Sequence, residues 1–124
     1  MNLISTALIL AVSGSLPQPD PVDAKVLVAA YARNAEDADK RYKAVRLRIT
    51  GVVAEEPALY RRSPLLALEG TGIHDRPVAV LDAARKEELA GLRTGQPITL
   101  DCLGNGHVSG TPMLKNCTLV QERP

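Results

Sequence analysis

The sequence of 124 residues contains neither Phe nor Trp, and its aromatic side chains are limited to Tyr31, Tyr42 and Tyr60. A hydrophobic core must therefore be built from Leu, Val, Ile and Ala. A binding site that depends on aromatic stacking has three rings at most to draw on. The chain also lacks an excess of either charge, with a formal net charge of +1 at pH 7. This balance argues against the broad positive surface of a general nucleic-acid-binding protein.

Groups for catalysis or metal binding are equally scarce. The chain has two cysteines and two histidines, with no C-x-x-C, H-x-x-x-H or glycine-rich phosphate-binding spacing. His74 stands beside Asp75, but no nucleophile motif accompanies the pair, and a small hydrolase is the weaker alternative. We therefore predict a protein that is not an enzyme, with no cofactor and no metal site.

Residues 1–16 carry no charged side chain, and their apolar stretch, Leu3 to Val12, is too short to span a bilayer. Small residues and the proline-rich segment 17–22 follow it. This order is typical of a secretory signal peptide and a linker, although no Lys or Arg lies near Met1. The prediction is a periplasmic or secreted protein with no transmembrane span after maturation. The alternative is a buried N-terminal helix of a cytosolic protein.

The remainder, residues 23–122, is predicted to form one domain. Apolar residues at three- and four-residue steps predict a helix over 23–42, with Asp23 as its N-cap. Alternation in the segment 44–56 predicts a strand, bent at Gly51. Four more short strands are expected at 64–70, 77–82, 96–104 and 111–122, with a helix capped by Asp82 between the third and fourth strands and ended by Gly95. The expected fold is mainly β, a five-stranded closed barrel with flanking helices.

Several segments carry a resemblance to a known family. They are AYARNAEDADKRYK leading into VRLRITGVV, then ELAGLRTGQPITLDCLG, and the closing LKNCTLV. In this order they resemble the bacterial tRNA_anti-like OB-fold family over roughly Leu27 to Val120. The resemblance implies an OB-fold barrel in a small exported protein or lipoprotein, and some members are phage-encoded. Fold similarity to anticodon-binding domains does not by itself imply tRNA binding.

The two cysteines lie on the last two expected strands. A hairpin through Asn105 to Gly110 with a symmetric register places Cys102 opposite Cys117, at a spacing that a disulfide accepts. Two free thiols and a metal site are the alternatives. Leu114 and Cys117 cannot both face the core in an unbroken strand, so a bulge is expected near Lys115 and Asn116.

Basic residues and one tyrosine gather around the first strand and the loops of the expected barrel. They form a candidate binding rim of Arg46, Arg48, Tyr60, Arg61, Arg62 and His107. OB-folds bind oligonucleotides or oligosaccharides near such loops. We predict an exported, non-enzymatic OB-fold module that contacts a protein partner or a cell-envelope polymer. The alternative function is binding of single-stranded nucleic acid, and the alternative reading of the rim is an ordinary solvated surface.

Overall fold

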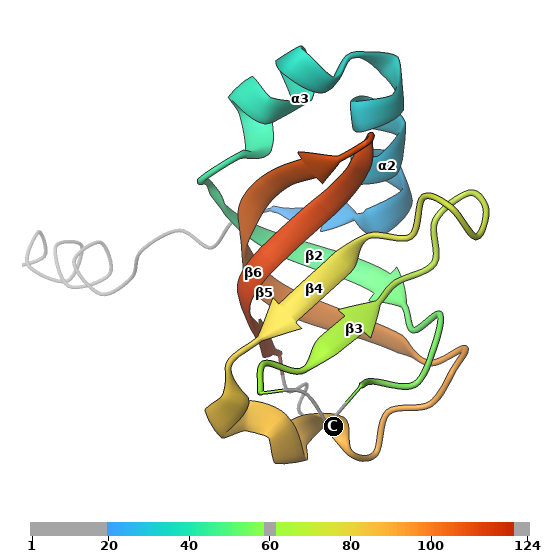
Figure 1. The fold of residues 1–124 in the computed structure, drawn as a ribbon, viewed down its shortest axis with the longest axis vertical. Helices are drawn as coiled ribbons and strands as arrows, with labels where there is room; N and C mark the ends of the chain where they lie inside the picture. The colour runs from blue at the N-terminus through green and yellow to red at the C-terminus, as the bar shows by residue number, and fades with distance from the viewer. Residues whose placement is uncertain (1–19, 59–61, 121–124) are drawn as a thin grey trace, which may run out of the picture.

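A computed structural model describes residues 20–58 and 62–120. Figure 1 shows a strongly curved sheet with two helices at one end and a short helix at the other. In chain order the elements are β1 (Pro21–Asp23), α2 (Ala24–Arg33), α3 (Ala35–Tyr42), β2 (Arg46–Val52), β3 (Leu65–Ala67), β4 (Val78–Leu81), the 3-10 helix η1 (Ala83–Leu89), β5 (Pro97–Val108) and β6 (Thr111–Leu119).

The sheet has six strands in the order β1-β2-β5-β6-β4-β3, so the predicted count of five is wrong. β1 and β2 run parallel, as do β4 and β6, and the other neighbours are antiparallel. The extra strand is β1, whose residues Pro21 and Val22 lie in the predicted linker 17–22. Pro21 and Val22 of the predicted linker therefore pair with β2, and residues 17–19 lie outside the described residues.

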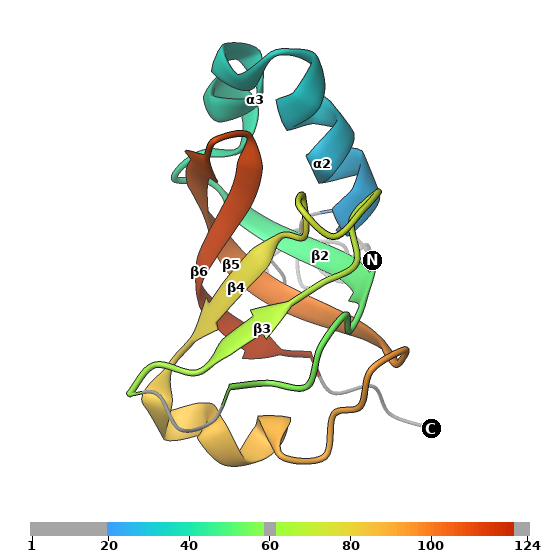
Figure 2. The same cartoon turned by 45° about the vertical axis from the view of Figure 1, so that its right-hand side comes forward.

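The predicted closure of the barrel is also incorrect, because β1 and β3 are the two edges of an open sheet. β1 pairs with Arg48 to Thr50 on the side of β2 that a closing strand would need. β2 and β3 approach only beyond this point, at an isolated bridge between Val53 and Leu68. Around it, the Glu69 amide donates to the Val52 carbonyl at 2.8 Å. Figure 2 shows β3 and the end of β2 converging at this side of the sheet.

The N-terminal helical segment is two helices rather than the one predicted over 23–42. Asp23 caps α2 as expected, since its carboxylate accepts from the Lys25 amide at 2.8 Å. Asn34 then adopts an extended conformation, with its own amide bonded to Ala30 and its side chain accepting from the Asp37 amide at 3.0 Å. One residue thus ends α2 and begins α3, because it satisfies backbone groups of both helices.

A helix does lie between the third and fourth predicted strands, as expected. It is the short 3-10 helix η1, with Asp82 as N-cap and Leu89 completely buried. η1 ends at Leu89, so Gly95 does not end this helix as predicted; its φ of +90° instead serves the turn just before β5. η1 and the α2–α3 pair lie at opposite ends of the sheet (Figure 1).

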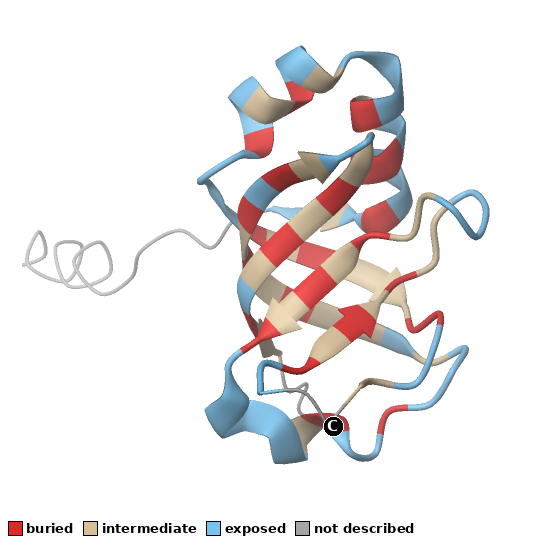
Figure 3. Ribbon diagram, viewed as in Figure 1, coloured by how far each residue is buried: buried red, intermediate tan, exposed pale blue. Residues whose placement is uncertain are grey.

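The core is aliphatic, as the composition requires. Its largest fully buried side chains come mainly from the strands, as do Ile49, Leu81 and Leu100, with Leu27 from α2 and Leu89 from η1. Figure 3 shows buried and partly exposed positions alternating along the strands, the pattern of a sheet with one covered face. Tyr31 and Tyr42 are also buried, at 4% and 9% exposure, where the helices meet the β5–β6 hairpin. Two of the three tyrosines therefore serve packing.

Candidate functional site

The first long strand turns two arginines away from the core. Leu47 and Ile49 are buried, whereas Arg46 is exposed and Arg48 is partly exposed. This follows from the alternation of side chains along a strand. On the neighbouring strand, Asp101 and Leu103 lie directly across from Arg48 and Arg46 and are partly exposed. The two rim arginines on β2 are thus brought together, on the face opposite the core.

Arg48 is held by a carboxylate. Its Nε donates to Asp101 Oδ1 at 2.8 Å and its Nη2 donates to Oδ2 at 2.9 Å, a two-point contact between β2 and β5. About a quarter of each side chain is exposed. Hydrogen bonding from Arg48 lowers the pKa of the Asp101 carboxyl, and the positive charges of Arg48 and Arg46 add to this effect. Both groups are therefore ionised at neutral pH, and their charges cancel locally.

Arg46 has no such partner among the residues that the structure describes. Within the described residues, neither Arg46 nor Lys115 belongs to an ion pair. Both lie in one row across the sheet, since Arg46 pairs with Leu103 and Leu103 pairs with Lys115. Neighbouring strands are about 4.8 Å apart, so the two backbones stand about 10 Å apart on either side of Leu103. We use the name strand face for this surface, which comprises Arg46, Arg48, Asp101, Leu103, Lys115, Asn116 and Thr118.

The strand face contains a shallow hollow of about 380 Å³. Its lining residues are Arg46, Asp101, Cys102, Leu103, Asn116 and Thr118. A second hollow of about 570 Å³ involves the same three strands nearer η1, where Thr50, Gln96 and Thr99 contribute to its lining. The first hollow combines a cation, a carboxylate, an amide, a hydroxyl and an aliphatic side chain. Such a surface offers several contacts to a small polar group.

The shape of this hollow depends on a bulge in β6. Leu103 pairs with Lys115 and Asp101 pairs with Thr118, so Asn116 and Cys117 together face Cys102. Asn116 has a φ of +51°, a left-handed conformation that asparagine tolerates better than most residues. The bulge predicted near Lys115 and Asn116 is therefore confirmed. It exposes Asn116 while Leu114 and Cys117 both remain buried.

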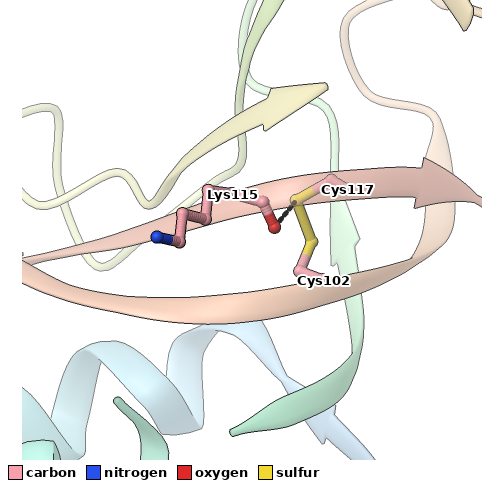
Figure 4. Close-up of a disulfide and its surroundings, with 3 residues drawn as sticks. All are labelled: Cys102, Lys115 and Cys117. Atoms are coloured by element: carbon pink, nitrogen blue, oxygen red, sulfur yellow. Dashed lines mark hydrogen bonds between the residues drawn. A yellow bond between two sulfur atoms is a disulfide. The ribbon is translucent and has the colours of Figure 1, made fainter. Parts of the chain in front are cut away.

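Cys102 and Cys117 form a disulfide beneath the strand face, with their α-carbons 4.1 Å apart. Figure 4 shows the bond joining β5 to β6, with Cys117 Sγ 3.7 Å from the Lys115 carbonyl oxygen. This is a polar contact and not a hydrogen bond, because a disulfide sulfur carries no proton. Both residues are buried, at 4% and 0% exposure. The bridge therefore fixes the bulge and the two strands that carry most of the hollow.

His107 lies elsewhere and is not a loop residue. It belongs to β5, opposite Pro112, because the hairpin turn consists of Ser109 and Gly110, with φ of +50° and +87°. Its Nδ1 accepts from the Gly110 amide at 2.9 Å, and its ring centroid is 5.3 Å from that of Tyr31. The structure thus places this rim candidate at the helix end of the sheet, in a packing role.

The other three rim candidates, residues 60–62, lie in the connection that follows β2 and not on the strand that carries the two arginines. Arg62 is exposed in the connection between β2 and β3. Tyr60 and Arg61 lie outside the described residues. The six candidates therefore do not form one rim in the described part of the chain. The strand face instead unites Arg46 and Arg48 with residues of β5 and β6.

Asp75 lies in the turn between β3 and β4. Asp75 accepts hydrogen bonds from Thr71 and from the Gly72 amide, and these bonds lower its pKa. It therefore organises its own turn. Across residues 20–58 and 62–120, no three His, Cys, Asp or Glu side chains are grouped as metal ligands would be. Over the same ranges, no helix has the length and hydrophobicity needed to cross a membrane.

Comparison with known protein families finds a match to one family. The sequence model of the tRNA_anti-like family matches residues 10–118. No curated protein matches the chain in sequence.

Two solved structures show what the fold is similar to. One, from Klebsiella pneumoniae subsp. pneumoniae MGH 78578, is described as a "putative nucleic acid-binding lipoprotein" and is 13% identical, with a TM-score of 0.69 over 98% of this chain and 99% of that one. The other, described as a "putative aspartyl-tRNA synthetase" from Leishmania major Friedlin, is 10% identical, with a TM-score of 0.56 over 90% of this chain and 22% of that one. At these identities the likeness concerns the fold alone.

Proposed function

Because the chain belongs to the tRNA_anti-like family, we propose that it is a binding module that uses its strand face to contact a protein partner or a cell-envelope polymer, without catalysing a reaction. The observation that carries this proposal is the pair of arginines on β2. Arg48 is neutralised by Asp101, whereas Arg46 stands beside a hollow without a carboxylate partner among the described residues. An unneutralised guanidinium beside a hollow can bind a group of opposite charge on a partner.

The surface that carries Arg46 is also rigid. β5 and β6 are joined by a two-residue turn and by the Cys102–Cys117 bridge, and β2 is paired on both sides. Binding to a preformed surface requires little ordering of the protein, which favours affinity from a small number of contacts. This supports a module that presents a fixed surface to its partner.

We further propose that the protein acts outside the reducing cytosol, in the periplasm or in secreted form. The disulfide supports this, since such bonds persist mainly in oxidising compartments. The predicted signal peptide, residues 1–16, lies outside the described residues. Intact mass of natively expressed protein, before and after reduction, tests both points. Loss of the leader and a gain of two hydrogens on reduction are expected, and a full-length chain with free thiols would contradict export.

The main proposal is tested by mapping amide chemical shifts while the protein is titrated separately with an acidic peptide, a polyuronate and a single-stranded oligonucleotide. We expect the acidic peptide or the polyuronate to shift resonances of Arg46, Leu103, Asn116 and Thr118 together. Shifts caused by the oligonucleotide alone would favour the second candidate function below. Shifts that cluster on the outer side of β3 and β4, or that are absent for every probe, would contradict the use of the strand face.

A second candidate function is binding of single-stranded nucleic acid. The described function of the Klebsiella protein favours it, because that chain shares the fold over its whole length. Phosphate contacts make binding strongly salt-dependent. A steep salt dependence with micromolar or tighter affinity for an oligonucleotide would support this function, and no binding at low salt would remove it.

A further inference from the structure

Resting on the proposed function, we infer that the hollow on the strand face is a carboxylate-binding site that takes an acidic side chain from a protein partner. The site comprises the guanidinium of Arg46, the amide of Asn116 and the hydroxyl of Thr118, arranged around Leu103. Lys115, opposite Leu103 on β6, adds a positive charge beside the hollow. The proposal gives the strand face a specific ligand chemistry, which the function proposed above leaves open.

The same surface already binds one carboxylate. Arg48 contacts both oxygens of Asp101 through two donors of one guanidinium, at 2.8 and 2.9 Å. Arg46 is two residues away on the same face of β2 and offers an identical planar group with five donors. Because this group has no acidic partner among the described residues, a carboxylate supplied from outside can take that place.

The local charge limits how much negative charge the ligand carries. Three cations, Arg46, Arg48 and Lys115, share the face with one carboxylate, Asp101. Arg48 and Asp101 neutralise one another, and Asp101 borders the hollow, where it repels a second negative charge. A single carboxylate fits this balance better than a run of phosphates.

The uncharged part of the face indicates what kind of molecule carries the carboxylate. Leu103 is partly exposed between Arg46 and Lys115 and offers an aliphatic contact for the methylene groups of a Glu or Asp side chain. Bases and sugar rings are commonly held by aromatic platforms. The described tyrosines, Tyr31 and Tyr42, are buried against the β5–β6 hairpin and do not line the hollow. These features favour an acidic peptide segment.

The strand direction gives the ligand room to continue. The second hollow lies along the same strands, and its lining includes the hydroxyls of Thr50 and Thr99. Arg46 and Thr50 are four residues apart on β2, or about 13 Å. An extended peptide of about four residues covers this distance, with its acidic side chain at Arg46 and polar backbone groups at the two threonines.

The experiment uses the full chain and a labelled hexapeptide with one central Glu, with fluorescence anisotropy as the measure of affinity. The matched ligand carries Gln in place of Glu. The variants are Arg46→Gln and Lys115→Gln, and the control is Arg33→Gln, an exposed arginine in the last turn of α2. We expect the Glu peptide to bind, the Gln peptide to bind about tenfold more weakly, and Arg46→Gln to cause a similar loss.

A smaller loss, about threefold, is expected for Lys115→Gln, and no change is expected for Arg33→Gln. In parallel, the Nε–H resonance of Arg46 should shift with the Glu peptide only. Equal losses for Arg33→Gln and Arg46→Gln, or equal binding of the two peptides, would overturn the carboxylate site.

Competition with a polyuronate and with an oligonucleotide separates this inference from the broader proposal. If either polymer binds through Arg46 while the Glu peptide does not, the acidic-peptide inference is wrong and the strand face remains a binding surface. If no probe perturbs Arg46 or Asn116, both the inference and the proposed function fail.

Discussion

Gly104 of β5 packs directly against the backbone of Tyr42 at the end of α3. A β-carbon on Gly104 would lie 2.8 Å from the Tyr42 carbonyl carbon and closer still to its oxygen. The amide and carbonyl of Gly104 bond to Val45 and Ala44, each at 2.9 Å, so the strand cannot move away freely. This contact joins the helical pair to the sheet at the beginning of the strand that carries Arg46.

Gly104→Ala is therefore expected to destabilise the protein by about 2 kcal/mol or more, because the added methyl group meets backbone that is hydrogen-bonded in place. Urea unfolding measures the loss. Gly91→Ala is the matched control, since nothing lies within 4 Å of a β-carbon there and the change should be close to neutral. Similar unfolding midpoints for the two variants would contradict the close packing.

Loss of the disulfide is expected to lower the free energy of unfolding by about 3 kcal/mol, for a loop closed over a separation of 15 residues. Urea unfolding with and without a reductant measures the effect. The double variant Cys102→Ser/Cys117→Ser provides the control, because a reductant should leave its stability unchanged. If full reduction left the free energy of unfolding of the wild type unchanged, the bridge would not stabilise the fold.

The ion pair between Arg48 and Asp101 predicts a pH dependence with a definite sign. The pKa of Asp101 is lower in the folded protein than its ordinary value, so the ionised form stabilises the fold. This contribution is complete above about pH 4 and disappears as the pH falls through the lowered pKa. Asp101→Asn should cost about 1 kcal/mol at pH 7, a modest value for a partly exposed pair, and nothing in strong acid.

Thermal unfolding of wild type and Asp101→Asn between pH 2 and pH 7 measures this difference. Asp20→Asn serves as the control, because Asp20 is exposed and removal of its charge should have no comparable effect. A difference between wild type and Asp101→Asn that grew towards low pH would show that the ion pair does not stabilise the fold.

Asn34→Ala should destabilise the helical pair by about 1 kcal/mol, since α3 would lose the side-chain oxygen that accepts from the Asp37 amide. Asn34→Asp retains an acceptor at the same position and should restore most of the stability. Helicity by circular dichroism together with urea unfolding tests both variants. If Asn34→Ala proved as stable as wild type, the cap would contribute nothing to α3.

Features that depend on neighbouring residues could be predicted from the sequence. The caps at Asp23 and Asp82 and the positive φ of Gly95 follow from local backbone chemistry, although Gly95 lies in a turn beyond the end of η1. The disulfide and the bulge at Asn116 followed from counting outward from the hairpin, because antiparallel pairing converts position along the chain into proximity.

The features that the sequence prediction missed also have physical explanations. Asn34 with Asp37 three residues later carries the signal of a second helix start, but the continuous apolar stripe concealed it. Proline is rare in strands, so the sequence predicts a linker at Pro21 and Val22, although an edge strand such as β1 accepts proline. The Arg48–Asp101 contact joins residues 53 positions apart. It depends on the pairing of β2 with β5, which no local pattern encodes.

The pairing of β1 with β2 also determines where the N-terminal segment joins the folded domain. Pro21 lies opposite Arg48 in the parallel ladder, so the chain enters the folded body beside the two arginines. Any tether attached upstream, whether a fused protein or an anchoring group, would emerge at this border. Its length would then set how near a large partner can approach.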